Sequence, residues 1–170
     1  MGAALMNAEK IRQERISVTN DAVRQEYSQY LTPIETAKLA VDMLSNVNNP
    51  KCLDLGAGTG ILSVGLIERF GNNIEIDLIE KDKKLCDLCD NEISNLVATY
   101  NAICEDAISY NNNKEYDIVI LNPPYKKMSA NDIRQNLLPV TSPNLYSAFV
   151  LKAISMLKTN GECVAIIPRS

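Results

Sequence analysis

The sequence predicts an α/β fold in which a doubly wound, mostly parallel sheet carries helices on both faces. Short apolar runs alternate with helix-length segments from residue 51 onward, and connections of that length join parallel strands by crossovers. A glycine-rich turn follows the first apolar run, at the edge where such sheets bind ligands. The 170 residues are 46% hydrophobic, enough for one core. We therefore expect a single domain at 29–170, preceded by a helical arm at 1–28.

The N-terminal quarter of the chain predicts two helical segments of different quality. Residues 1–26 are polar and charged with scattered apolar positions, consistent with a helix or a loosely packed arm. A sharper signal follows, with Thr32 as helix cap, Pro33 at the first helical position and Glu35 completing a capping box. Apolar residues then recur at helical spacing, and the Asn-Asn-Pro segment 48–50 is expected to end this helix.

The strands and helices of the sheet are predicted from the apolar runs and the helical segments between them. Strands are expected at 51–55, 74–79, 98–104, 116–121 and 162–167. Helices are expected at 61–70, 83–96 and 146–157.

Composition excludes several classes of function. The net charge of -4 and the sequence pI near 4.9 are the reverse of the basic footprint of a self-sufficient nucleic-acid binder. No apolar run approaches the roughly 20 residues that span a bilayer, so we expect a cytoplasmic protein without a membrane partner. The chain has no histidine, which removes the commonest general base and the hydrolytic triads built on it.

The cysteines predict a reduced protein without a metal site. There are five of them, an odd number, mostly within segments expected to be buried, so a disulfide framework is not expected. Cys86 and Cys89 have C-x-x-C spacing, but no second pair answers them, and zinc is not expected.

The glycine turn at 54–60 predicts a nucleoside cofactor of a particular kind. Glycines let the backbone turn tightly and approach a ligand closely. A dinucleotide fingerprint would place its last glycine at position 61, which is Ile61, whereas the third glycine here is Gly60. Asp54, just before the first glycine, disfavours a pyrophosphate and suits a cofactor with a cationic amino-acid portion. The alternative is a glycine turn that binds nothing.

Two further acids stand where strands end. Glu80 closes the second strand, near the offset at which an acid accepts hydrogen bonds from a ribose; its alternative is a solvated strand-end charge. Asp106 follows the third strand and could accept a hydrogen bond from an adenine amino group. A helix cap is the alternative for Asp106.

The most specific feature is the Asn-Pro-Pro-Tyr segment 122–125, which follows the apolar run of the fourth strand. Consecutive prolines cannot donate to a sheet ladder, so they end the strand in an extended form. Asn122 and the carbonyls of Pro123 and Pro124 supply acceptors, and Tyr125 supplies an aromatic face. This combination suits a planar, amino-bearing substrate; an ordinary turn is the alternative.

In their order and spacing, the segment 54–60, Glu80, Asp106 and the segment 122–125 resemble the motif series of class I S-adenosylmethionine-dependent methyltransferases that modify planar amino groups. The segments 29–33 and 144–149 are similar to motifs of the gamma-type DNA adenine-N6 methyltransferases, including the Eco57I-like restriction-modification enzymes. The resemblance implies a Rossmann-like class I methyltransferase fold.

The resemblance also implies how S-adenosyl-L-methionine is bound. Thr32 and its neighbours would hold the methionine carboxylate, Asp54 and the two following glycines would line the methionine and ribose part, Glu80 would take the ribose hydroxyls, and Asp106 would take the adenine amine. Phe149 would pack near the cofactor, although a core position is its alternative, as a helix cap is for Thr32. The implied cofactor-binding set is Tyr30, Thr32, Pro33, Asp54, Gly56, Gly58, Glu80, Asp106, Ala107, Asn122 and Phe149.

The implied reaction is direct methyl transfer to N6 of an adenine flipped out of DNA. Asn122 and the Pro123 carbonyl would accept the two amine protons, and Tyr125 would stack on the base. The alternatives are the same chemistry on ribosomal RNA bases or a protein glutamine, and a non-catalytic cofactor-binding module.

The C-terminal boundary predicts a partial enzyme. The chain stops directly after its fifth expected strand, where a methyltransferase sheet of the usual kind has two more. We expect the last strands and the target-recognition region to be missing, so that DNA is bound weakly.

Overall fold

The computed structural model describes residues 2–18 and 31–168, and its core is a five-stranded parallel sheet with the strand order β3-β2-β1-β4-β5. The elements are α1 (Ala3–Val18), α3 (Ile34–Asp42), β1 (Lys51–Leu55), α4 (Ile61–Phe70), β2 (Glu75–Ile79), α5 (Lys83–Ser94), β3 (Thr99–Ile103), β4 (Tyr116–Leu121), the 3-10 helix η1 (Ile133–Leu137), α6 (Leu145–Ser155) and β5 (Leu157–Ala165). The predicted fold class is confirmed.

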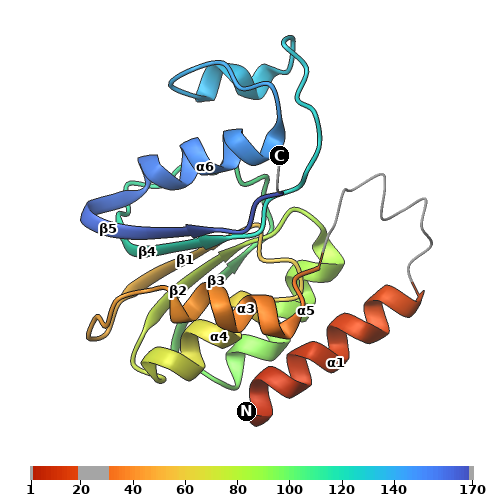
Figure 1. The fold of residues 1–170 in the computed structure, drawn as a ribbon, viewed down its shortest axis with the longest axis vertical. Helices are drawn as coiled ribbons and strands as arrows, with labels where there is room; N and C mark the ends of the chain where they lie inside the picture. The colour runs from red at the N-terminus through yellow and green to blue at the C-terminus, as the bar shows by residue number, and fades with distance from the viewer. Residues whose placement is uncertain (1, 19–30, 169–170) are drawn as a thin grey trace.

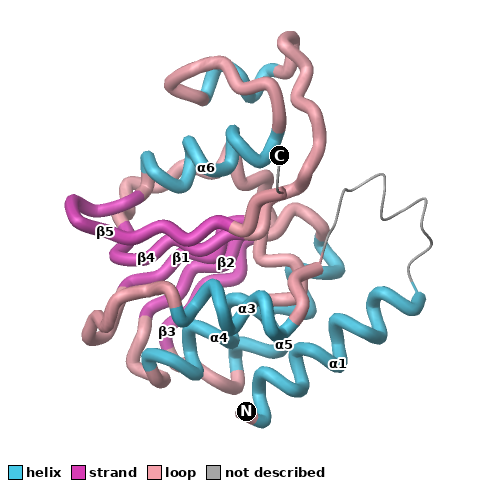
Figure 2. Tube along the Cα trace, viewed as in Figure 1, coloured by secondary structure: helices cyan, strands magenta, loops and turns pink. Residues whose placement is uncertain are grey.

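Helices cover both faces of the sheet, with α6 on one face and α1, α3, α4 and α5 on the other (Figures 1 and 2). Alternate residues of each central strand point to opposite faces. Cys52 and Ile118 therefore join the core beneath α3, α4 and α5, whereas Leu53 and Val119 join the core beneath α6. Within the described residues, no helix combines the length and apolar character needed to cross a membrane.

The prediction that Thr32 and Glu35 cap α3 is wrong. Pro33 occupies the cap position without a side-chain hydrogen bond, and the Thr32 hydroxyl accepts a hydrogen bond from Asn122 instead, at 2.9 Å. The Ile34 amide donates to the Glu9 carboxylate, at 3.2 Å. The acid at the start of α3 is therefore Glu9 of α1. Glu35 instead forms an ion pair with Lys38, three residues further along the helix.

The same helix ends at Asp42 rather than at 48–50. Other elements take the backbone groups that would continue it: the Leu44 carbonyl accepts from the Arg69 guanidinium, and the Ser45 amide donates to the Glu162 carboxylate at 2.8 Å. The helix ends early because tertiary partners satisfy its last polar groups.

The fifth strand begins at Leu157, five residues earlier than predicted, directly after α6. The first half of this strand is polar, so the sequence has no apolar run there from which a strand could be predicted. A register shift opposite Tyr116 and Ile118 and a positive φ of 67° at Asn160 accommodate this part. Gly161 permits the close approach, because a Cβ there would lie 2.9 Å from the Tyr116 carbonyl oxygen.

A disulfide between Cys86 of α5 and Cys104, just beyond β3, contradicts the expectation of unpaired cysteines. The two residues are 18 positions apart in the chain, one on α5 and one just after the strand that follows it. Their spacing in the sequence did not indicate this pairing. Cys89, the other half of the C-x-x-C segment, is a free buried thiol.

Candidate functional site

A cavity of about 570 Å³ opens at the carboxyl ends of the parallel strands, the edge at which open α/β sheets bind ligands. The predicted site residues that line it are Thr32, Gly56, Gly58, Glu80, Asp106, Ala107, Asn122, Pro124 and Phe149. Pro33, Asp54, Pro123 and Tyr125 are not among the lining residues. Tyr30 lies outside the described residues.

The glycine turn after β1 forms one wall of the cavity. The amides of Gly56 and Ala57 donate to the Ile79 carbonyl at 2.8 and 2.9 Å, which ties the turn to the end of β2. Gly56 has a φ of 88°, and a Cβ at this position would lie 3.1 Å from the Phe149 ring. The α6 aromatic ring therefore packs directly against backbone that only glycine provides without strain.

Glu80 fixes the far side of the same turn. Its carboxylate accepts hydrogen bonds from the Gly58 amide at 2.9 Å and from the Asp82 amide at 2.8 Å. Burial raises the pKa of Glu80, while these two backbone donors oppose the rise. A carboxylate has about four acceptor positions, so Glu80 retains capacity for the hydroxyls of a ribose in the cavity that it lines.

Asp54 lies behind the cavity wall rather than in it. Its side chain is completely buried, and Oδ2 accepts a hydrogen bond from the Ser63 hydroxyl at 2.6 Å. Among the described residues, nothing bonds Oδ1. Burial raises the pKa of Asp54 to about 7. Its position joins β1 to α4 beneath the turn.

Asp106 combines both of the roles weighed for it. Oδ1 accepts from the Ile108 amide at 3.0 Å, which is a local cap. Oδ2 faces the cavity rim, where Arg134 donates at 3.0 Å and Lys81 at 3.3 Å. Asp132 completes this group by binding the Arg134 guanidinium through both carboxylate oxygens, at 2.9 and 2.6 Å.

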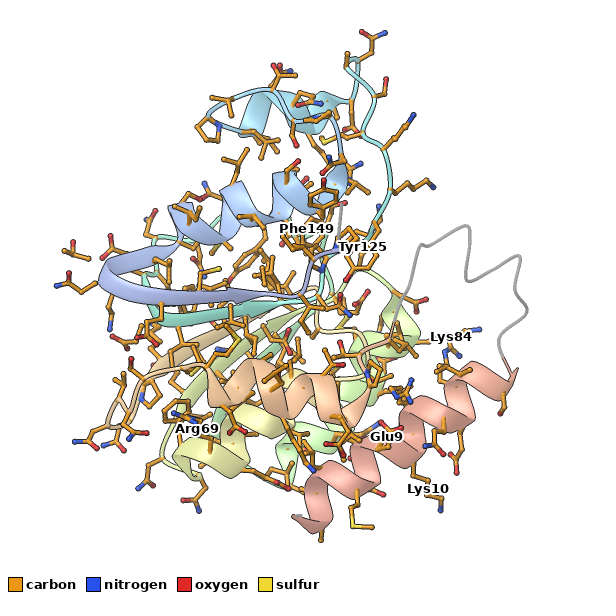
Figure 3. All side chains as sticks on the ribbon, in the orientation of Figure 1. Glu9, Lys10, Arg69, Lys84, Tyr125 and Phe149 are labelled. Carbon is orange, nitrogen blue, oxygen red and sulfur yellow. A yellow bond between two sulfur atoms is a disulfide. The ribbon has the colours of Figure 1, made fainter. Side chains whose placement is uncertain are left out.

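The Asn-Pro-Pro-Tyr segment leaves β4 directly at the cavity. The Asn122 amide nitrogen donates to Thr32 Oγ1 at 2.9 Å, so its carbonyl end is oriented by this bond. The Tyr125 hydroxyl lies 2.8 Å from Asn122 Oδ1 and 3.0 Å from the Ile166 carbonyl. Tyr125 and Phe149 lie toward the same end of the sheet (Figure 3). Strand β4 thus presents a held amide beside the glycine turn.

Several lining residues carried no signal in the sequence. Thr59 is 2% exposed, lines the cavity and has a hydroxyl without a partner among the described residues. Lys126, Lys127 and Arg134 line the rim from the segment after the tyrosine. That segment has neither helical nor strand periodicity, so no pattern pointed to it.

These features fit the cofactor predicted from the sequence. The unbonded Thr59 hydroxyl is a polar group that awaits a partner, and Gly56 provides a surface that a Cβ would fill. Glu80 and Asp106 supply acceptors at separate points of the lining. A ligand with a ribose, an amino-bearing ring and a cationic centre matches that donor and acceptor set.

Comparisons with known proteins point to one family. The methyltransferase small domain model matches residues 34–170. The type II methyltransferase M.BsuBI of Bacillus subtilis is 31% identical over 173 residues, covering 86% of this chain and 34% of the relative. The tRNA1(Val) (adenine(37)-N6)-methyltransferase of Pedobacter heparinus is 25% identical over 178 residues, covering 96% of this chain and 68% of the relative.

The chain matches only part of the length of these relatives. The chain spans about a third of the length of the B. subtilis relative. A solved SAM-dependent O-methyltransferase from Thermotoga maritima has a TM-score of 0.63 at 14% identity, covering 90% of this chain and 52% of that chain. At that identity the likeness concerns the fold.

Proposed function

Because this chain belongs to the methyltransferase small domain family, we propose that it transfers a methyl group from S-adenosyl-L-methionine to the N6 amine of adenine in DNA, within a restriction-modification system. The observation that carries the proposal is the position of Asn122, an amide held by Thr32 at the mouth of a cofactor-sized cavity. The B. subtilis relative, a type II methyltransferase, supports DNA as the substrate.

The cofactor would be held by the residues of the cavity wall. Glu80 would accept from the ribose hydroxyls, and Asp106 with Ala107 would bind the adenine end. Thr32 would bind the carboxylate of the methionine portion, while the Phe149 ring would border the cofactor beside Gly56. When bound, the cofactor supplies a methyl group activated by a sulfonium.

Asn122 would prepare the acceptor amine. The N6 lone pair of adenine is delocalised into the ring, which makes it a poor nucleophile. Hydrogen bonds from its two protons to Asn122 Oδ1 and the Pro123 carbonyl would favour a pyramidal nitrogen and hold it in line with the methyl group. The cofactor would supply the methyl group as an electrophile with sulfur as its leaving group, while Asn122 Oδ1 and the Pro123 carbonyl would hold the amine until one N6 proton passes to solvent.

The substrate adenine would enter the cavity after it has left the DNA duplex. N6 is stacked and paired in duplex DNA, so the adenine must be extruded. Tyr125 would stack on it after giving up its hydrogen bond to Asn122 Oδ1, which the incoming amine replaces. We propose that a separate region supplies sequence recognition, because the 170 residues carry a net charge of -4.

RNA adenine is the second candidate substrate. The P. heparinus relative, a tRNA adenine-N6-methyltransferase, matches 96% of this chain. The chemistry at Asn122 would be unchanged, since the reacting group is the same amine. Only the polymer that delivers the base would differ.

Calorimetric titration with S-adenosylmethionine tests the cofactor site first. We expect saturable binding that weakens about tenfold or more in Glu80→Ala, since two ribose hydrogen bonds to a charged group are lost. Asn122→Ala should still show saturable cofactor binding, although it loses the bond to Thr32, and should lose methyl transfer. A folded chain that binds no cofactor would overturn the proposal.

A transfer assay then decides the substrate. Labelled methyl incorporation would be compared on unmethylated genomic DNA and on unmodified tRNA, using the protein together with any recognition subunit. Incorporation into DNA as N6-methyladenine is expected. Incorporation into tRNA alone would replace DNA with the second candidate.

A further inference from the structure

The segment 126–144, which we call the rim loop, is built as a fixed projection beside the cavity. Its two ends are pinned together: the Leu145 amide donates to the Lys126 carbonyl at 2.7 Å, and the Met128 amide donates to the Pro143 carbonyl at 3.0 Å. The loop rises beyond α6, away from the sheet (Figure 1). Its base therefore holds a constant position relative to the Asn-Pro-Pro-Tyr segment.

Side chains brace the interior of the rim loop. Gln135 spans it, donating to the Ser142 carbonyl at 2.7 Å and accepting from the Ser142 amide at 2.9 Å. Arg134 ties it to Asp106 on the opposite side of the cavity rim. An ordered loop with these bonds presents its outer side chains in defined places.

Three of the exposed side chains of the rim loop are aliphatic. Ile133 is 80% exposed, and Leu137 and Val140 are exposed as well. Ile133 stands between Asp132 and Arg134, both of which line the cavity. Three exposed aliphatic side chains within one short, braced loop form an apolar surface beside the cavity, and such surfaces can mark interaction sites.

Cations accompany these apolar side chains. Lys126 and Lys127 follow the Asn-Pro-Pro-Tyr segment and line the cavity mouth. In the described part of the chain, carboxylates hold Arg134, whereas no ion pair engages Lys127. In an acidic chain, an exposed ammonium next to the site of the extruded base complements a backbone phosphate.

We propose that the rim loop is the surface on which this domain grips duplex DNA beside the extruded adenine, with Lys127 on a flanking phosphate and Ile133 inserted into the gap in the base stack. This inference rests on the proposed function. Aliphatic wedges of this kind partly unstack duplexes in other DNA-binding proteins, and an extruded base leaves the space for one. Phosphate contacts position the duplex without reading its sequence.

The phosphate contact is tested by the salt dependence of binding to a random-sequence duplex, measured by fluorescence anisotropy from low salt upward. Lys127→Gln should lower the slope of log affinity against log salt by about one relative to the wild type. Lys10→Gln is the matched control, because Lys10 is an exposed lysine on α1 (Figure 3), and it should leave the slope unchanged. An unchanged slope in Lys127→Gln, or no binding by the wild type at low salt, overturns the proposal.

The wedge is tested with the same duplex carrying one abasic site, which offers a ready-made gap. The wild type should prefer the abasic duplex roughly fivefold or more, and Ile133→Ser should reduce that preference toward unity. Ile154→Ser on α6, another exposed isoleucine, should keep it. Equal preference in Ile133→Ser and the wild type overturns the wedge.

Cofactor titration of every variant separates the two proposals. Lys127→Gln and Ile133→Ser should bind S-adenosylmethionine as the wild type does, because neither is assigned to cofactor binding. Absence of cofactor binding in the wild type sinks the proposed function. Normal cofactor binding and DNA methylation with unchanged slope and preference sink only the rim-loop inference.

Discussion

Asp54 is a buried acid whose titration affects the stability of the whole domain. The sequence predicted that Asp54 lines the cofactor site; the side chain lies behind the glycine turn, where it accepts a hydrogen bond from Ser63. Burial raises its pKa from 3.8 to about 7. Between pH 3.8 and pH 7 the folded protein keeps a proton on Asp54 that the unfolded chain has lost. The contribution of Asp54 to the free energy of unfolding is therefore fully present below about pH 3.8 and is lost as the pH rises through about 7.

Replacing Asp54 with asparagine should flatten this part of the pH profile. The side-chain amide introduced by Asp54→Asn keeps an acceptor for the Ser63 hydroxyl and does not titrate. Relative to the variant, the wild type should lose up to about 3 kcal/mol of unfolding free energy between pH 5 and pH 8. Urea unfolding of both proteins at the two pH values measures the difference. Parallel profiles would show that Asp54 does not titrate in this range.

Single residues of the site were predictable where one strand end determines them. Glu80 and Asn122 close β2 and β4, and both line the cavity as the sequence indicated. Thr59 and Arg134 were missed because their importance depends on neighbours from other parts of the chain. An unbonded hydroxyl or a guanidinium between two carboxylates leaves no periodic pattern.

Among the elements, α1 is joined to the domain by side chains that only the folded chain brings together. Leu5 and Ala8 are buried in the core that includes α4, and the Leu5 amide donates to Glu68 at 3.0 Å. Glu9 caps α3. The sequence indicated a helix in this region but not its partners, because its apolar positions are too scattered to define a buried face.

Truncating one buried side chain of α1 should therefore destabilise the domain. Leu5 is 1% exposed, so Leu5→Ala should lower the unfolding free energy by about 2–4 kcal/mol through lost burial and a new cavity. Met6, its exposed neighbour, gives the matched control, and Met6→Ala should change stability by less than about 0.5 kcal/mol. Chemical denaturation monitored by circular dichroism measures both. Equal effects would mean that α1 is not part of the cooperative core.

For the whole molecule, alternation of apolar runs and helices was enough to predict the parallel sheet, and the bounds of α4 and β4 agree with the prediction to the residue. The methyltransferase family and its cofactor, S-adenosyl-L-methionine, are also confirmed. The end of α3 and the start of β5 were not predictable, since Glu162, Arg69 and the bulge opposite β4 set them.

The disulfide gives a prediction for the chain as a whole. Cys86 and Cys104 are paired, whereas Cys52, Cys89 and Cys163 are free. Unfolded without reductant, the protein should show three reactive thiols by a colorimetric assay, and five after reduction. Cys86→Ser, which releases Cys104, should show four without reductant. Five thiols in the unreduced wild type would contradict the pairing.

The parallel pairing of β1 with β4 has a consequence for folding. Asp54 lies opposite Ile120 in the sheet, yet β2, β3 and three crossover connections separate these strands along the chain. Pairing between distant segments is slow, because the entropy of closing the intervening chain is lost before contacts form. The glycine turn can therefore form early, from neighbouring segments, while Asn122 reaches it only after β4 has docked on β1. During synthesis, the glycine turn and Glu80 emerge before Asn122, which joins them only when β4 has been made.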